Sequence, residues 1–160
     1  MSNPNQAQVI HTPNTLQMKV GGGRFSLDAD AVARAEAALK SLSGQFAQWM
    51  QDELDKLEAA RADIRAKGMT GETSETLYMR AHDLKGLGAT YEFPLVTRIA
   101  ASLCKLIDNP ETRAAAPLPL VDAHIDAIKA AVRDGIRNDE HPVGKVLVEE
   151  LETRTRAHLK

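Results

Sequence analysis

The sequence has little that could form covalent or metal cross-links, because its 160 residues include only one cysteine, Cys104. A single cysteine cannot pair within the chain, and a zinc site built from cysteines is also disfavoured. Cys104 lies in an apolar stretch with helical spacing, which predicts a buried, unreactive thiol. A domain of this size buries roughly two-thirds of the surface that its unfolded chain exposes, so it needs no such cross-link to fold.

Charge of one sign and long apolar runs are also scarce. The formal net charge is −2 at pH 7, and no strongly basic block is present that would favour nucleic acid. The apolar stretches are far shorter than the ~18–20 residues that a membrane span needs. The first residues lack the charged start and apolar core of a secretory signal. With the single cysteine, these features predict a cytoplasmic protein that binds neither nucleic acid nor a membrane.

The chain divides into two parts by composition. Residues 1–26 are rich in Asn, Gln, Pro and Gly and include three consecutive glycines, which predicts a flexible arm and linker. From residue 27 to 160 the pattern is helical almost throughout, and no alternation typical of strands is present. We therefore expect a single helical domain over residues 27–160.

Apolar spacing and end signals predict where the helices lie. Ser43-Gly44 is expected to break or kink the first helix, Lys67-Gly68 to end the following one, and Thr73 or Ser74 to cap the next. The predicted helices cover about residues 29–42, 45–67, 74–91, 94–107, 121–136 and 143–160, with a stop at Asp108-Asn109-Pro110 and a Pro/Ala loop at 114–119. These helices predict an all-α fold, an antiparallel four-helix bundle with its core at about residues 44–138. An N-terminal helical extension and an additional C-terminal helix are expected to pack on its outside.

The segment Ala81–Tyr91 carries the residues of chemical interest. On a helix with 100° between residues, two faces separate. The core face contains Leu77, Ala81, Leu84, Gly88 and Tyr91. A second face, about 130° around the helix, contains His82, Lys85, Gly86 and Ala89. This second face is predicted to point largely to solvent.

This exposed face has a plausible chemical use. An imidazole that titrates near pH 6.5 is largely neutral and nucleophilic at pH 7. Lys85, three residues after His82, can offer positive charge to an incoming phosphoryl group. Gly86, one turn after His82, leaves room for a partner, although glycine inside a helix costs roughly 1 kcal/mol relative to alanine. Taken alone, a surface histidine beside a lysine is most often ordinary solvated surface.

The string A-H-D-L-K-G-L-G-A resembles the signature of histidine phosphotransfer (HPt) domains, His-x-x-Lys-Gly with an Ala before the His and a Leu two residues after it. In that family the histidine lies in the middle of a bundle helix and accepts a phosphoryl group from a receiver-domain aspartate. The resemblance implies that His82 is the phosphorylation site, Lys85 the phosphate-facing cation and Gly86 the small residue that permits docking. Tyr78 and Ala89 lie near this face and are expected to contact the receiver.

One position departs from the family pattern, because many members have a glycine ten residues after the histidine, where this chain has Glu92. This substitution leaves the turn after the helix undecided. Among the other histidines, His124 is expected at the boundary of the apolar stripe of its helix, and none makes a spaced ligand pair. We therefore expect no metal site and no cofactor.

The resemblance implies a phosphorelay intermediate that passes a phosphoryl group between receiver domains, including a receiver within a hybrid histidine kinase. No ATP-binding motif is present in the sequence, so we expect no kinase activity. Two alternatives remain open: a helical adaptor without phosphotransfer, and a phospho-accepting domain detached from a chemotaxis-type kinase. A monomer is expected, since one bundle uses all four apolar stripes.

Overall fold

The computed structural model describes residues 24–160, so most of the expected arm at 1–26 lies outside the described residues. Within residues 24–160 the chain is all-α, as the sequence predicts, with no strand. The chain divides into two compact units, one ending at Gly44 and the other comprising Gln45–Lys160. The second unit is a helical bundle that starts close to the expected core boundary at residue 44.

The first described helix, α2, runs from Arg24 to Lys67. The predicted break at Ser43-Gly44 is wrong, because helical backbone continues through both residues. A glycine costs roughly 1 kcal/mol in a helix but does not prevent helical geometry, so good helix formers on either side keep the helix intact. The predicted end is confirmed: α2 stops at Lys67, and Gly68 takes a left-handed φ of +81°.

The next helix, α3, spans Gly71–Leu87. Its cap is Thr70 and not the expected Thr73 or Ser74. The Thr70 hydroxyl accepts from the Thr73 N–H at 3.1 Å, and the Thr73 hydroxyl accepts from the Thr70 N–H at 2.9 Å. This reciprocal pair satisfies two N–H groups that would otherwise be free at the helix start, which places the beginning of α3 three residues earlier than predicted.

The chain then turns at residues 88–93 and continues as α4, Pro94–Leu106, in agreement with the prediction that Pro94 starts a helix. A short helix that was not predicted, α5, covers Pro110–Ala115 and reaches the start of the Pro/Ala loop expected at 114–119. Asn109 explains the difference, because its side chain accepts from the Thr112 N–H at 3.0 Å while the Thr112 hydroxyl accepts from the Asn109 N–H. Such a capping pair stabilises a first helical turn.

Helix α6 covers Leu118–Asp134 and ends at Gly135, which has a left-handed φ of +68°. Helix α7 covers Pro142–Leu159. It was expected outside the bundle, yet Val148 and Leu151 are buried in the common core. Val146, expected on the apolar side of this helix, is instead 68% exposed. Helix α7 is therefore an integral part of the bundle.

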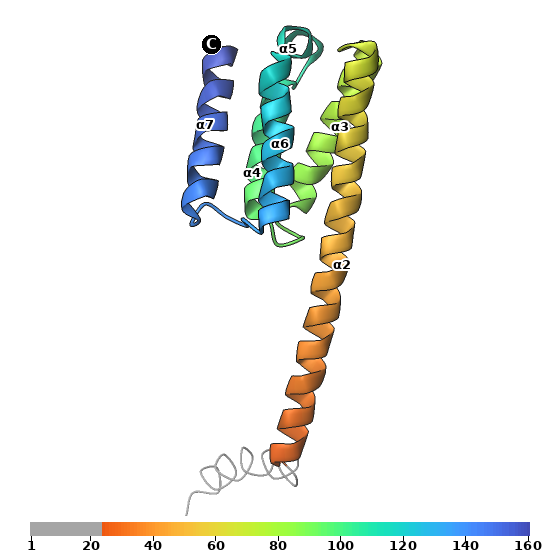
Figure 1. Ribbon diagram of the computed structural model, residues 1–160, viewed down its shortest axis with the longest axis vertical. Coiled ribbons are helices and arrows are strands. Elements are labelled where there is room, and N and C mark those ends of the chain that lie inside the picture. Colours follow the sequence, from red (N-terminus) through yellow and green to blue (C-terminus); the bar gives the residue numbers. More distant parts are fainter. Residues whose placement is uncertain (1–23) are drawn as a thin grey trace, which may run out of the picture. The chain divides into compact units, whose positions relative to one another are not determined.

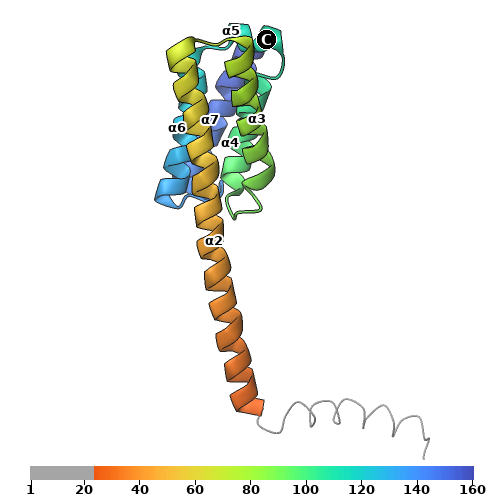
Figure 2. The ribbon, with the colours of Figure 1, turned by 90° about the vertical axis from the view of Figure 1, so that its right-hand side faces the viewer.

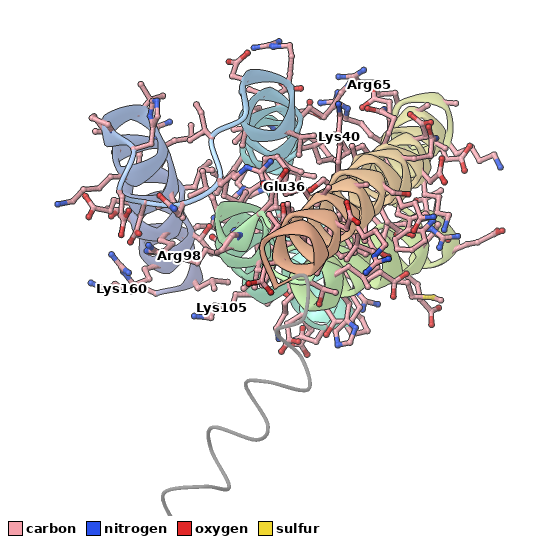
Figure 3. The ribbon with its side chains drawn as sticks, turned by 90° about the horizontal axis from the view of Figure 1, so that it is seen from below. Glu36, Lys40, Arg65, Arg98, Lys105 and Lys160 are labelled. Carbon is pink, nitrogen blue, oxygen red and sulfur yellow. The ribbon has the colours of Figure 1, made fainter. Side chains whose placement is uncertain are left out.

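Helices α3, α6 and α7 each pack against α4 in the bundle, and α6 also contacts α7, as Figures 1 and 2 show. The core is apolar and is made of residues from every long helix of this unit. Polar contacts tie α4 to α7 at its surface: Arg98, labelled in Figure 3, donates to Asp139 at 3.0 Å and to Glu152 at 2.9 Å. Among the described residues, no helix is both long and apolar enough to cross a membrane.

Candidate phosphotransfer site

Helix α3 presents the predicted exposed face. His82, Lys85 and Gly86 are exposed, whereas Ala81 and Leu84 are fully buried. The buried residues fix the rotation of the helix, because turning α3 to bury His82 would bring Ala81 and Leu84 into water at a cost of about 1.5–3 kcal/mol for the leucine alone. The imidazole therefore points to solvent from a rigid element.

The two glycines of the motif have opposite surroundings. A Cβ added at Gly86 would meet nothing within 4 Å, so the helix surface beside His82 is open space. A Cβ at Gly88 would lie 2.6 Å from the Thr97 hydroxyl and 2.7 Å from the Thr97 amide nitrogen. Packing against α4 therefore requires a glycine at 88, and no packing within the described chain requires one at 86.

Aromatic and cationic groups border His82 on one side. The Tyr78 ring, one turn earlier on α3, lies 6.1 Å from the imidazole between centroids. The guanidinium carbon of Arg113, from α5, lies 4.9 Å from the centre of the Tyr78 ring. Arg113 is held there by a 2.9 Å hydrogen bond from its Nε to the Ile107 carbonyl oxygen. Sequence reasoning missed Arg113, because only the fold of α5 brings it to α3.

Lys85 supplies charge on the same face. Within residues 28–160 it makes no ion pair, so no carboxylate of that part of the chain neutralises it. Its field reaches Cys104 on α4, where burial raises the pKa of the thiol to about 11 and the positive charge of Lys85 acts in the opposite direction. Cys104 is buried, as predicted.

The end of the motif differs from the prediction, because α3 stops at Leu87 and not at Tyr91. Ala89 is exposed but lies in the turn, where its N–H donates to the Thr97 hydroxyl at 2.8 Å. Tyr91 is half-buried and stacks on Phe46 at 5.6 Å between ring centroids.

Glu92 takes the backbone conformation that a glycine would favour. Its φ is +70°, and it is the one residue other than glycine with a positive φ in the described part of the chain. Arg137 stabilises this position by donating to the Glu92 carboxylate at 2.8 Å. The sequence left the conformation of this turn undecided. In the structure the residue ten positions after His82, where many family members have a glycine, has a left-handed backbone although it is a glutamate.

The other histidines are placed elsewhere. His124 was expected at a boundary, but it is fully buried. Its Nδ1 lies 2.8 Å from the Leu120 carbonyl oxygen, and its Nε2 lies 2.9 Å from the Ser102 hydroxyl and 3.3 Å from that of Thr155. These partners explain the error. From the sequence, His124 lies only beside an apolar stripe, whereas in the fold two hydroxyls from α4 and α7 provide hydrogen bonds to its ring, so the ring can be buried. His141 instead caps α7 by accepting from the Val143 N–H.

Comparison with protein families gives a match to the Hpt domain over residues 41–135, more than half of the chain. The chain belongs to the Hpt domain family. Searches among curated proteins and among solved structures found no match. The matched segment contains α3 with the exposed face described above and ends at Gly135, before α7.

Membership of the Hpt family makes this chain a phosphotransfer module of two-component signalling, and Hpt domains act with the receiver domains of response regulators. Within the described residues, no group of three or more His, Cys, Asp or Glu side chains could hold a metal ion. The exposed face of α3 carries the imidazole of His82, the cation of Lys85 and open space at Gly86.

Proposed function

We propose that His82 accepts a phosphoryl group from the aspartyl phosphate of a receiver domain and passes it to the aspartate of another receiver. The observation that carries this proposal is the arrangement on α3, where an exposed imidazole stands one turn from a glycine with open space around it. A receiver has to bring its phosphoaspartate within bonding distance of the ring, and a side chain at position 86 would obstruct that approach.

The transfer step needs little from this chain. A ring nitrogen of His82 attacks the phosphorus, the bond from phosphorus to the aspartate oxygen breaks, and the carboxylate leaves with the electron pair. Such a reaction depends mainly on positioning and on stabilising the charge of the transferred group. Lys85, three residues after His82 on α3, would provide that stabilisation from this chain, and the receiver would supply the acidic pocket with its Mg²⁺.

The docking surface would extend from His82 toward α5. Tyr78 offers apolar ring surface, and Arg113 above that ring adds a positive charge at the same edge. Ala89 forms the opposite border and carries only a methyl group. This combination of small, apolar and cationic groups suits a partner whose phosphorylation pocket is acidic.

In this proposal the chain is an intermediate of a cytoplasmic relay and not a kinase. The helical adaptor would use Gly86 for packing, and the open space at that position does not favour it. A donor kinase of the chemotaxis type would phosphorylate the same histidine directly with ATP, so the identity of the donor separates the two remaining schemes.

The test is incubation of the full chain with a purified receiver carrying labelled phosphate on its aspartate. We expect acid-labile label on the wild-type chain and none on His82→Gln. His141→Gln and His158→Gln are matched controls, because both residues are also exposed, and they should be labelled normally. Label that persists on His82→Gln contradicts the assignment. Label that requires ATP and a kinase, with no receiver able to donate, replaces the relay by the kinase scheme.

A further inference from the structure

The N-terminal part of α2 has an apolar face that remains exposed. Every residue from Asp28 to Gly44 is exposed. The apolar members include Val32, Leu39 and Leu42, which are 54%, 64% and 41% exposed. Together with Ala35, these three residues form an apolar stripe, which we call the seam. In proteins most of the stability of a helix comes from packing an apolar face against a partner and not from helix propensity.

The spacing of the seam selects the kind of partner. Its residues alternate at intervals of three and four, which are the a and d positions of a heptad repeat with Val32 at a. The two heptads from Val32 to Leu42 thus have apolar or alanine side chains at a and d. The next two positions with this spacing, Phe46 and Trp49, pack on Tyr91 within the bundle and are not part of the seam. Such a repeat is complementary to another helix with the same repeat, and less so to a flat surface or a β-strand edge.

The residues beside the seam favour a second copy of this chain. Partner choice in coiled coils is set mainly by charges at positions e and g. Here the e positions are Glu36 and Ser43, and the g positions are Ala31 and Ala38. In a parallel pair, Glu36 faces Ala31 of the other copy and Ser43 faces Ala38, so no like charges meet at the e and g positions beside the seam.

Of the remaining charges in residues 28–44, three lie at positions away from the seam, and the fourth, Asp28, lies at position d one heptad before Ala35. Arg34 and Lys40 occupy positions c and b, away from the seam, and Figure 3 labels Lys40 together with Glu36 four residues earlier. No g-position charge is present that would select a partner with the opposite e-position charge. A helix without such selecting charges pairs with itself as well as with any other helix, and its own copy is always present at equal concentration.

We propose that this protein forms a homodimer through a parallel two-stranded coiled coil of the N-terminal part of α2, with the seam at its centre. This replaces the monomer expected from the sequence, which considered only the stripes of the bundle. The inference rests on the surface of residues 28–44 and does not depend on phosphotransfer.

The test compares variants of the full chain by sedimentation equilibrium over a wide concentration range. We expect the wild type to reach twice the chain mass of 17.4 kDa. Leu39→Glu/Leu42→Glu should raise the dissociation constant on the order of a hundredfold or more, since four buried leucines per dimer become charged. Ala37→Glu/Ser41→Glu adds the same charge at positions f and c and should leave the dimer unchanged.

Several results would overturn the proposal. A wild type that stays monomeric at all concentrations would mean that a different protein or the segment before residue 24 covers the seam. Equal effects of the two double variants would place the contact elsewhere, and a trimer or tetramer would exclude the two-stranded form. A disulfide across the Leu42→Cys dimer, absent in Ser41→Cys, would establish the parallel orientation. Phosphoryl uptake by both glutamate variants is measured separately, so failure of the relay and failure of the dimer are distinguishable.

Discussion

His82 and His124 are the same kind of residue in two regions with opposite demands. His82 lies on the exposed face of α3, where the Tyr78 ring, 6.1 Å away between centroids, is its one aromatic neighbour among residues 28–160. His124 lies among α4, α6 and α7, where both ring nitrogens have hydrogen-bonding partners within 2.9 Å. The comparison teaches that a histidine available for chemistry is one whose nitrogens the fold leaves unused, whereas a fully bonded histidine holds helices together.

Replacing each of these two histidines gives the largest expected effects. His82→Gln should lose phosphoryl uptake altogether while its free energy of unfolding changes by less than about 0.5 kcal/mol, as is usual at exposed sites. His124→Ala should lose roughly 2–4 kcal/mol, because it leaves a cavity and unsatisfied hydroxyls. Urea unfolding and labelling of the same variants would check both. Full uptake by His82→Gln, or normal stability of His124→Ala, would break the comparison.

Gly86 in α3 and Gly88 directly after it sharpen the same contrast between an open face and a packed one. Gly86→Gln should fold normally and transfer phosphate much more slowly, because its side chain occupies the open space beside the ring. Gly88→Ala should cost about 1–3 kcal/mol, because its Cβ would overlap Thr97. Melting temperatures and transfer rates of both variants are the measurement. Reduced stability of Gly86→Ala would show that position 86 is packed after all.

Lys85→Ala tests whether the open face contributes charge to the reaction. We expect transfer to slow by roughly tenfold or more while receiver binding weakens less, since a cation aimed at the transferred group acts mostly in the transition state. Single-turnover transfer rates and a binding isotherm separate the two effects. Lys85→Arg is the control that keeps the charge, and it should recover part of the rate. Equal rates for wild type and Lys85→Ala would remove this lysine from the mechanism.

The buried histidine also predicts a dependence of stability on pH. Burial lowers the pKa of His124 from its ordinary 6.5, and the hydrogen bond to the Leu120 carbonyl partly opposes this shift. The unfolded chain therefore takes up a proton near pH 6.5 that the folded chain takes up only at lower pH. Stability should be unaffected by this group above pH 6.5 and should fall as the pH decreases below it. In urea titrations from pH 7.5 to 5, this decrease should be smaller in His124→Gln than in His141→Gln, whose imidazole is exposed.

The smallest expected effect concerns Glu92, at the end of the turn that follows the exposed face. Glu92→Gly removes the left-handed strain of about 1 kcal/mol but also the partly exposed ion pair to Arg137, which is worth at most about 1 kcal/mol. Glu92→Ala loses the pair and keeps the strain. We therefore expect the glycine variant to be the more stable of the two by several tenths of a kcal/mol, with unchanged phosphotransfer in both. Equal stability would mean that the backbone conformation carries no cost.

Local signals predicted most of the fold. The end of α2 at Lys67-Gly68 and the start of α4 at Pro94 were predictable because glycine and proline restrict the backbone through their own covalent structure. The cap at Thr70 was missed because several neighbouring threonines and serines could all cap, and only the reciprocal bond with Thr73 decides among them. Helix α5 was missed because its alanines and prolines suggested a loop and the capping pair at Asn109 was overlooked.

The exposed face of α3 was predictable because helical geometry converts sequence spacing into direction, so His82, Lys85 and Gly86 had to lie together. The sequence by itself thus determined the all-α class, this face and the motif that marks it. Only the tertiary structure decided that Arg113 lies over Tyr78 and that Ser102 and Thr155 enclose His124. The physical reason is distance along the chain: contacts within a helix follow from its fixed pitch, whereas contacts between helices depend on how their apolar faces pack.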